Sequence, residues 1–256
     1  MGKGGAEEMG GEGREGREGE KCAIKWPMER YVVVKAKNMR QLTLLYLLLC
    51  SLTAGAYGID VSHHQGRIDW DAVPRDVEFV YVKATEGATY VDPMYERNIR
   101  EARRNGFKVG SYHFFRMTST PEEQFENIKK YVVKGEQDLR LMIDVETTDG
   151  RDVGQVQDSL QVLLNLVEDY FGCEPIIYGT NRSYNRICAP RFNGYDLYIG
   201  RYNEYWEPII FGWFKRALIW QYTDKGVVAG VPGKVDLAKG LSSDAVSRLC
   251  CRKEEE

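Results

Sequence analysis

The 256-residue chain has few of the residues that several common kinds of site require. Six cysteines are too few for a scaffold built on disulfides. There are three histidines, with His63 and His64 adjacent and His113 apart from them. No His-x₃-His spacing or cysteine pair accompanies them, so neither a zinc site nor any other metal or cofactor is expected. We expect the adjacent rings to point apart, in loops or bonded to acids.

Positive charge is not in excess either. Lys and Arg total 35 against 38 for Asp and Glu, which gives a formal net charge of −3 at pH 7. This balance provides no broad basic surface, so nucleic acid is not an expected partner. The sequence also lacks a glycine-rich phosphate loop after its first expected strand, and it has no G-x-S-x-G element. These absences argue against a nucleotide-binding fold and against a serine hydrolase.

The composition changes near residue 57. Residues 1–38 open with a Gly- and Glu-rich stretch, which predicts a disordered extension, and a true start at Met39 would place it upstream of the biological chain. Residues 39–56 then have the parts of a secretory signal peptide: a basic start, an uncharged apolar run, and the cleavage form Ala54-Gly55-Ala56. The favoured prediction is an exported protein, secreted or periplasmic.

The alternative is an uncleaved signal-anchor helix over 41–59, which would attach the protein to a membrane. After the signal, Cys173 and Cys188 can pair if the chain is exported, but free buried thiols are the favoured state. The adjacent Cys250 and Cys251 are assigned no function. They lie in residues 242–256, which are predicted to form a polar C-terminal tail.

From residue 57 onward, short apolar runs alternate with amphipathic stretches. Strands are expected at 57–61, 78–84, 108–115, 140–146, 175–179, 195–201 and 217–222, with a weaker one near 231–236. Helices are expected at 93–105, 121–134, 153–171 and 182–188, with a short turn near 70–74. The alternation predicts an α/β fold, a single incomplete TIM-like barrel with about eight strands and five helices. The alternative is an open doubly wound sheet.

Four carboxylates fall at the ends of expected strands, where a parallel barrel carries its chemistry: Asp60, Asp144, Glu146 and Asp236. Asp144 and Glu146 are two residues apart, so both side chains share one face, with Cα atoms about 6.6 Å apart. Repulsion between them should raise one pKa and leave a proton donor beside an ionised carboxylate. Glycoside hydrolysis needs this arrangement. The motif alone is a weak signal, because an Asp-x-Glu at a strand end is usually a solvated edge pair or a capping pair; the convergence of Asp60 and Asp236 on the same end strengthens it.

Lys83 alternates with Tyr81 and Phe79 along the second expected strand. On the interior face it would offset the acids, and otherwise its side chain would reach the rim. Aromatic residues also gather near the strand ends. About half of them should pack in the core, and the rest can form a cleft whose rings stack on sugar rings. These aromatic residues are Tyr112, Phe114, Tyr178, Tyr198, Trp220 and Tyr222.

Six stretches, taken in order, resemble glycoside hydrolase family 25, the Chalaropsis-type lysozymes or N-acetylmuramidases. They are GIDVSHHQGRIDW (58–70), FVYVKATEG (79–87), GFKVGSYHFF (106–115), MIDVE (142–146), PIIYG (175–179) and IWQYT (219–223). The resemblance covers about 57–238, and it implies a catalytic barrel over 57–241. The family's last motif usually reads VDLN, whereas this chain has VDLAKG, with Ala238 in place of the Asn.

The resemblance implies cleavage of the β-1,4 bond between N-acetylmuramic acid and N-acetylglucosamine in bacterial peptidoglycan, the expected partner. Glu146 would be the general acid, Asp144 would polarise the 2-acetamido group or a water, and Asp60 and Asp236 would complete an acidic floor. Tyr112, Tyr178 and Gln221, together with Glu86, would contact the substrate. No membrane partner is expected beyond an uncleaved signal segment, and a monomer is expected. The alternatives are a non-catalytic wall-glycan binder and a glycosidase for another polymer such as chitin.

Overall fold

The computed structural model describes residues 57–203 and 217–251, so the predicted extension 1–38 and signal peptide 39–56 lie outside the described residues. The strands are β1 (Tyr57–Val61), β2 (Val77–Glu86), β3 (Tyr90–Val91), β4 (Lys108–Phe114), β5 (Met142–Asp144), β6 (Ile176–Thr180), β7 (Leu197–Gly200), β8 (Ile219–Gly226) and β9 (Val235–Gly240). The α-helices are α2 (Tyr95–Arg104), α3 (Pro121–Tyr131), α4 (Val153–Phe171), α5 (Asn181–Ser183) and α6 (Ala245–Leu249). A 3₁₀ turn η1 (His63–Gln65) and a π-helical turn η2 (Tyr184–Cys188) complete the set.

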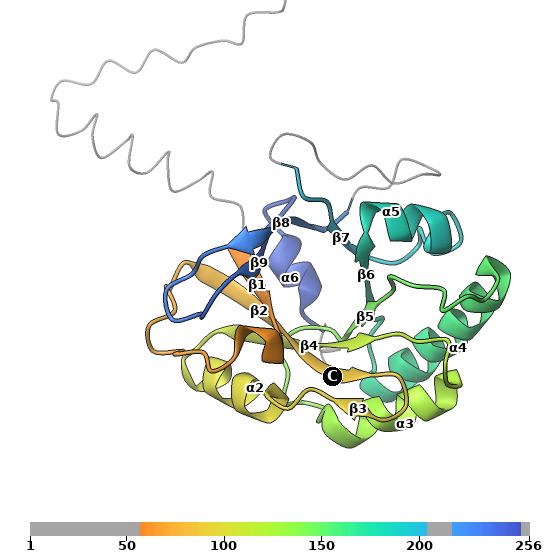
Figure 1. Cartoon of the computed structure of the whole chain (residues 1–256), viewed down its shortest axis with the longest axis horizontal. Helices are drawn as coiled ribbons and strands as arrows, with labels where there is room; N and C mark the ends of the chain where they lie inside the picture. The colour runs from red at the N-terminus through yellow and green to blue at the C-terminus, as the bar shows by residue number, and fades with distance from the viewer. Residues whose placement is uncertain (1–56, 204–216, 252–256) are drawn as a thin grey trace, which may run out of the picture. The chain divides into compact units, whose positions relative to one another are not determined.

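The sheet closes on itself into a barrel (Figure 1). Its strand order is β1-β9-β8-β7-β6-β5-β4-β2-β3, and a further pairing of β1 with β2 joins the two ends. Eight strands therefore form the ring, and β3 pairs only with the end of β2. The predicted α/β barrel is confirmed, because closure by the β1–β2 pair rules out the open doubly wound sheet.

The last strand differs from the expectation in position and direction. It covers Val235–Gly240 rather than 231–236, and it runs antiparallel to both β8 and β1, whereas the other ring neighbours are parallel. Asp236 therefore lies near the start of its strand, not at its end. The reversed direction still brings it to the same end of the barrel as Asp60, its partner in the β1–β9 register.

Alternating side chains divide the core into two layers. One layer fills the barrel with Phe79, Tyr81, Met142, Tyr178 and Tyr198, among others. The intervening residues face outward and pack against the helices, as Ile143 and Val145 do with Leu160 and Leu163 of α4. Because Phe79 and Tyr81 lie inside, Lys83 continues the interior face toward the mouth of the barrel.

Capping residues mark the start of α3 and the end of α4. Thr120 accepts a hydrogen bond from the Glu123 amide in a capping box, with Pro121 in the first turn, so α3 begins as the sequence predicts. Helix α4 covers 153–171 as predicted and ends at Gly172, which adopts φ of 77° in the left-handed region. Helices α2, α3 and α4 lie outside the ring of strands (Figure 1).

The stretch assigned to a polar tail differs from the expectation. Within it, α6 buries Ala245, Val246 and Leu249 against the residues that fill the barrel. The Arg140 amide donates to the Leu249 carbonyl at 2.7 Å, and Leu139 forms an isolated bridge with Cys250. These contacts place α6 across the end where the parallel strands begin, opposite the mouth.

The cysteines also differ from the expectation. Cys173 is bonded to Cys251 in a disulfide, so it is neither a free thiol nor a partner of Cys188. The sequence could not show this pair, because 78 residues separate the two cysteines. Cys188 is buried and free, as favoured. Across 57–203 and 217–251, no helix combines the length and apolar character that a membrane span requires.

Candidate active site

Asp60 lies near the end of β1 and is almost fully buried, at 5% exposure. Its Oδ2 accepts hydrogen bonds from the Tyr198 hydroxyl at 2.6 Å and from Gln221 Nε2 at 2.7 Å. The pKa of Asp60 is raised to about 7: burial is the largest cause, the negative charge of Asp236 adds to it, and the two hydrogen bonds oppose the rise. Oδ1 is buried and has no hydrogen-bond partner among the described residues.

Asp144 and Glu146 differ in exposure although they share one face. Asp144 ends β5 and is buried at 7% exposure, with Oδ1 unpaired among the described residues, whereas Glu146 is exposed two residues later. Burial raises the pKa of Asp144 well above its usual range, and repulsion from Glu146 adds to this. The pKa of Glu146 is raised as well, because the surrounding mouth strips part of its hydration.

This result corrects the sequence argument in one respect. Burial, rather than repulsion between the two acids, is the main cause of both raised pKa values. The larger rise falls on Asp144, not on the residue that the resemblance makes the proton donor. Exposure separates the two groups more clearly than pKa does: Glu146 can reach a bound molecule, while Asp144 is enclosed behind it.

The four predicted acids come together at the mouth. The charge of Asp236 acts on Asp60, that of Asp60 acts on Asp144, and those of Glu146 and Asp224 act on Asp236. Burial, followed by these charges, raises the pKa of Asp236 to about 6. Each of the four therefore has a raised pKa and is coupled to at least one of the others. Such a cluster can donate a proton and stabilise a developing positive charge.

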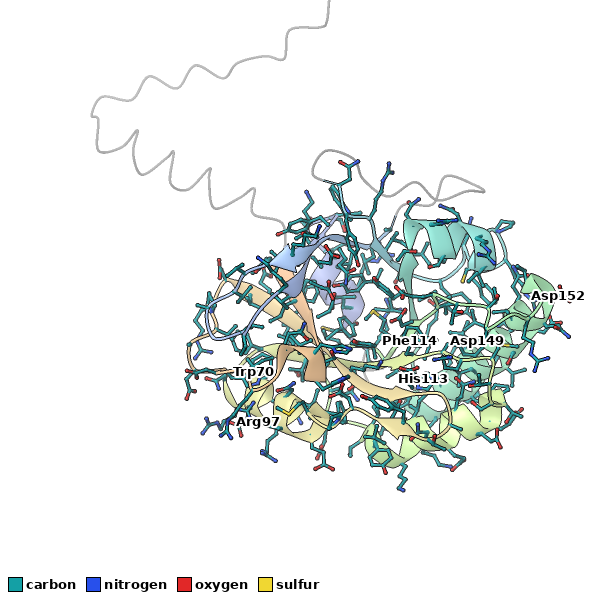
Figure 2. The ribbon with its side chains drawn as sticks, in the orientation of Figure 1. Trp70, Arg97, His113, Phe114, Asp149 and Asp152 are labelled. Atoms are coloured by element: carbon teal, nitrogen blue, oxygen red, sulfur yellow. A yellow bond between two sulfur atoms is a disulfide. The ribbon has the colours of Figure 1, made fainter. Side chains whose placement is uncertain are left out.

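Cations form one side of the mouth. Lys83 lies on the interior face, as one of the two predictions had it, and its Nζ contacts Glu86 Oε2 at 2.8 Å. Arg116 joins Glu86 Oε1 at 2.7 Å to Asp149 Oδ2 at 2.9 Å. The two cations lower the pKa of Glu86 despite its partial burial, so Glu86 is an ionised part of an ion-pair network. Figure 2 shows Phe114 and Asp149 on the same side of the molecule as His113.

The predicted substrate contacts are connected to the acids by hydrogen bonds. The Tyr178 hydroxyl donates to Gln221 Oε1 at 2.7 Å, and Gln221 in turn donates to Asp60. Tyr112 lies at the mouth, and burial together with the charges of Asp144, Asp60 and Asp236 raises its pKa. Tyr112, Tyr178 and Gln221 thus adjoin the acid cluster, whereas Glu86 reaches it through Lys83.

Sequence reasoning missed two groups beside the acids. The bond from Tyr198 to Asp60 joins residues 138 apart, and the half-exposed Tyr202 donates to Gln221 Oε1 at 3.1 Å. The sequence identifies Tyr198 only as one of several aromatic residues near strand ends. Tyr202 lies two residues after the end of β7. Its position after a barrel strand, where the mouth is expected, was the only sequence signal that it belongs to the site.

The histidines lie partly as expected. The rings of His63 and His64 do not point apart: their centres are 4.0 Å apart, because η1 is a tight turn rather than a strand. His63 bonds to Asp92, and His113 is buried between Thr85 and Gln124. Burial lowers the pKa of His113 to about 4, so it is neutral at pH 7.

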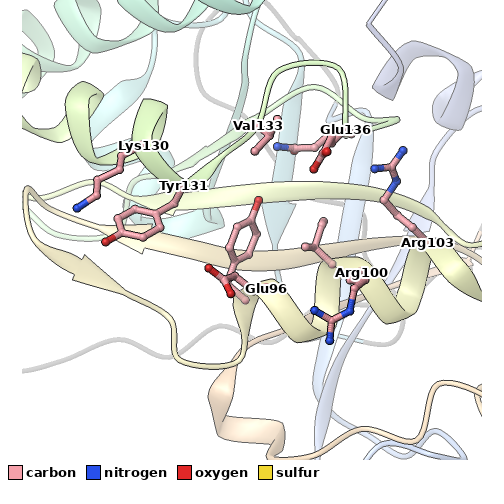
Figure 3. A pocket seen from close by; sticks show the side chains of 10 residues that line it. Glu96, Arg100, Arg103, Lys130, Tyr131, Val133 and Glu136 are labelled. Carbon is pink, nitrogen blue, oxygen red and sulfur yellow. The ribbon is translucent and has the colours of Figure 1, made fainter.

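A separate cavity of about 520 Å³ lies between α2 and the end of α3 (Figure 3). Its lining includes Glu96, Arg100 and Arg103 from α2 and Lys130 and Tyr131 from α3. None of the four acids lines it. The acid cluster at the mouth is therefore a different site from this cavity.

Comparison with known proteins agrees with this geometry. Uncharacterized protein YegX of Escherichia coli K12 is 34% identical over 186 residues, which cover 70% of this chain and 67% of that protein. An autolytic lysozyme of Clostridium acetobutylicum is 30% identical over 181 residues, covering 70% of this chain and 54% of the relative, so the chain spans about half of it. The crystal structure of a bacterial lysozyme from Streptomyces coelicolor superposes with a TM-score of 0.69 at 28% identity, covering 77% of this chain and 96% of that one.

The similarity to a family model includes three of the four acids. Residues 59–231 match the family model described as Glycosyl hydrolases family 25, which takes in Asp60, Asp144 and Glu146. Asp236 follows the matched range and reaches the cluster through the antiparallel strand β9. With its closed barrel and its acidic mouth, this chain belongs to glycosyl hydrolase family 25.

Proposed function

We propose that this protein is a lysozyme that hydrolyses the β-1,4 bond between N-acetylmuramic acid and N-acetylglucosamine in bacterial peptidoglycan. The observation that carries the proposal is the cluster of four coupled acids, of which Glu146 alone is exposed. Two of the relatives compared above are described as lysozymes, which supports the choice of peptidoglycan. Family membership makes the protein a glycoside hydrolase.

Glu146 is the proton donor in this proposal. Its raised pKa favours the protonated form, and sugar covering the mouth would remove more water and favour it further. As the bond between the anomeric carbon and the glycosidic oxygen breaks, that oxygen takes the proton of Glu146 and leaves with its sugar. Water then supplies hydroxide to the anomeric carbon, and its remaining proton restores Glu146.

The remaining acids stabilise the positive charge that develops on the sugar ring. Asp144 lies directly behind Glu146 and assists by polarising either the 2-acetamido group or a water. Asp60 and Asp236 form the acidic floor. Tyr112, Tyr178 and Gln221 contact the substrate around them, and Glu86 holds Lys83 in place.

Hydrolysis fits the site better than binding alone. A protein that only held glycan would gain nothing from four coupled carboxyl groups whose pKa values are all raised, two of them buried at a cost in stability. A glycosidase for chitin would use the same chemistry, so only substrates distinguish it.

We further propose that the protein acts as a monomer outside the cytoplasm, exported by residues 39–56, and that it meets a membrane only if this segment stays uncleaved. The Cys173–Cys251 disulfide supports export, since oxidising compartments preserve such bonds.

The test is the release of reducing ends from purified peptidoglycan by the wild type and by Glu146→Gln. We expect the variant to lose about 100- to 10,000-fold in rate, as the loss of a general acid does. Glu78→Gln is the matched control, because Glu78 is exposed near the start of β2, at the opposite end of the barrel. Mass spectrometry of the fragments identifies the sugar at the new reducing end. Equal rates for the wild type and Glu146→Gln would refute the assignment.

A further inference from the structure

Three ring-bearing side chains lie at the mouth of the barrel and are not used by the mechanism above: His63, His64 and Tyr90. We call them the rim cluster. His63 and His64 form the turn η1 just after β1, and Tyr90 of β3 pairs in register with Glu86 at the end of β2. Both segments therefore lie at the end of the barrel that carries the acids.

Electrostatic contacts show that the rim cluster adjoins the acids. Lys83 Nζ lies 5.4 Å from the centre of the Tyr90 ring, and its charge opposes the rise in the pKa of both Asp144 and Glu146. Asp92, which holds His63, acts on Tyr112 together with Asp144 and Asp60. A glycan strand leaving the acids on this side would reach the three rings.

A buried carboxylate fixes the cluster. Asp92 Oδ2 accepts from His63 Nδ1 at 2.7 Å and from the His63 amide at 3.0 Å, and Oδ1 accepts from the Met94 amide at 2.9 Å. The Tyr90 hydroxyl lies 3.2 Å from the same Nδ1. The side chain of Asp92 has no exposed area, while that of His63 is 33% exposed. The structure thus buries a carboxylate to hold an imidazole that faces solvent.

The exposed surface has the chemistry of a saccharide site. Tyr90 is 38% exposed, His64 is exposed, and the ring centres of His63 and Tyr90 are 6.2 Å apart. Within the described part of the chain, nothing bonds to His63 Nε2, so this nitrogen can exchange a hydrogen bond with a hydroxyl group. Rings that stack on a pyranose face, beside a fixed polar atom, are what a sugar site provides. A core role would bury the rings instead.

We propose that the rim cluster binds a further sugar ring of the glycan strand, beyond the two rings that flank the cleaved bond. The inference rests on the proposed lysozyme function and adds a binding site to it. Tyr90 and His64 supply the stacking surface, and His63 Nε2 bonds to a sugar hydroxyl. Because the contact lies away from the reacting bond, it favours long strands without changing the chemical step.

The experiment compares kcat and KM for peptidoglycan glycan fragments of increasing length. We expect Tyr90→Ala and His64→Ala each to lower kcat/KM about fivefold to tenfold on long fragments, through KM, as the loss of a stacked ring does. The shortest cleaved fragment should be unaffected. Tyr90→Phe keeps the ring and should retain most of the affinity. Dissociation constants for long fragments, measured in a Glu146→Gln background, should follow the same order.

Tyr131→Ala is the control, since Tyr131 is a partly buried tyrosine in the cavity beside α3, away from the acids (Figure 3). It should leave the dependence on length intact. The rim-cluster inference alone would be overturned if Tyr90→Ala and His64→Ala lost kcat/KM equally on all fragment lengths, or lost none on long fragments, while the wild type cleaved normally. If the wild type cleaved no fragment, the proposed function would fail and this inference with it.

Discussion

At the scale of single residues, the buried carboxyl group of Asp60 couples the stability of the fold to pH. Its pKa is about 7 in the folded state against 3.8 for the free group, so the folded state binds more protons between these values. Stability should therefore fall as the pH rises from about 4 to about 7, by at most roughly 4 kcal/mol from this group. Asp236 acts in the same direction up to about pH 6.

Denaturant unfolding at pH 5 and pH 8 checks this prediction. The wild type should be the more stable at pH 5, and Asp60→Asn should reduce the difference, because the amide oxygen can still accept from Tyr198 and Gln221 without taking a charge. Asp236→Asn should reduce it by a smaller amount. A pH dependence left intact in Asp60→Asn would contradict the raised pKa.

Because Gly200 has no side chain, Tyr178 and Gln221, which form the hydrogen-bond chain to Asp60, can pack against its backbone. A Cβ atom at this position would lie 2.7 Å from the Tyr178 hydroxyl oxygen and 3.0 Å from Gln221 Oε1. We expect Gly200→Ala to displace both side chains, to cost about 1–3 kcal/mol of stability and to lower activity. Gly194→Ala is the matched control, since nothing lies within 4 Å of its added methyl group. Thermal unfolding and reducing-end release measure the two effects, and equal behaviour of the two variants would count against the crowding.

The residues of the site were predictable where one strand carries them. Alternation placed Asp144 and Glu146 on one face of their strand, and it placed Phe79, Tyr81 and Lys83 together on one face of the second strand. Contacts between strands were not predictable, because they depend on strand order. Tyr198 reaches Asp60 across 138 residues, and the anchor of His63 is an aspartate in a separate loop.

At the scale of elements, the disulfide anchors Cys251, which lies just after α6, to a residue just after the end of α4. Cys173 follows α4, and its bond to Cys251 closes a loop of 78 residues. We expect Cys173→Ser with Cys251→Ser to lower the free energy of unfolding by about 2–4 kcal/mol. A reducing agent should destabilise the wild type similarly and leave this variant unchanged.

Cys250→Ala serves as the control, because Cys250 is a free thiol beside the bonded one. It should keep the response to reducing agent. Loss of that response in Cys250→Ala would mean that Cys250, not Cys251, pairs with Cys173.

The helices α3 and α4 were predicted better than α6, because their ends carry local sequence signals whereas α6 was taken for part of a polar tail. The expected start of α3 at 121 and the expected bounds of α4 at 153–171 agree with the structure, whereas α3 ends at Tyr131 rather than at 134. Short strands gave less information, because an alternating pattern carries no direction. The antiparallel course of β9 and its shift to 235–240 were therefore missed.

At the scale of the whole molecule, one end of the barrel carries the candidate active site and the other end is closed by packing that stabilises the fold. The acids occupy the mouth, while α6 covers the opposite end with Leu249 fully buried. We expect Leu249→Ala to lower the free energy of unfolding by about 2–5 kcal/mol and to leave KM for peptidoglycan unchanged. Val227→Ala, at a side chain 73% exposed, should change stability by less than about 0.5 kcal/mol. A change in KM for Leu249→Ala would show that the two ends are not independent.

The reversal of β9 has a consequence for how the chain is routed. In a ring of uniformly parallel strands, the last strand would end at the mouth, and a separate segment would be needed to bring the chain back to the opposite end. Here β9 itself runs from the mouth to the opposite end of the barrel. It places Asp236 at the mouth, and the chain then continues into α6 at the opposite end. An insertion between Gly240 and Ala245 should therefore weaken the packing of α6 and leave the acids at the mouth in place.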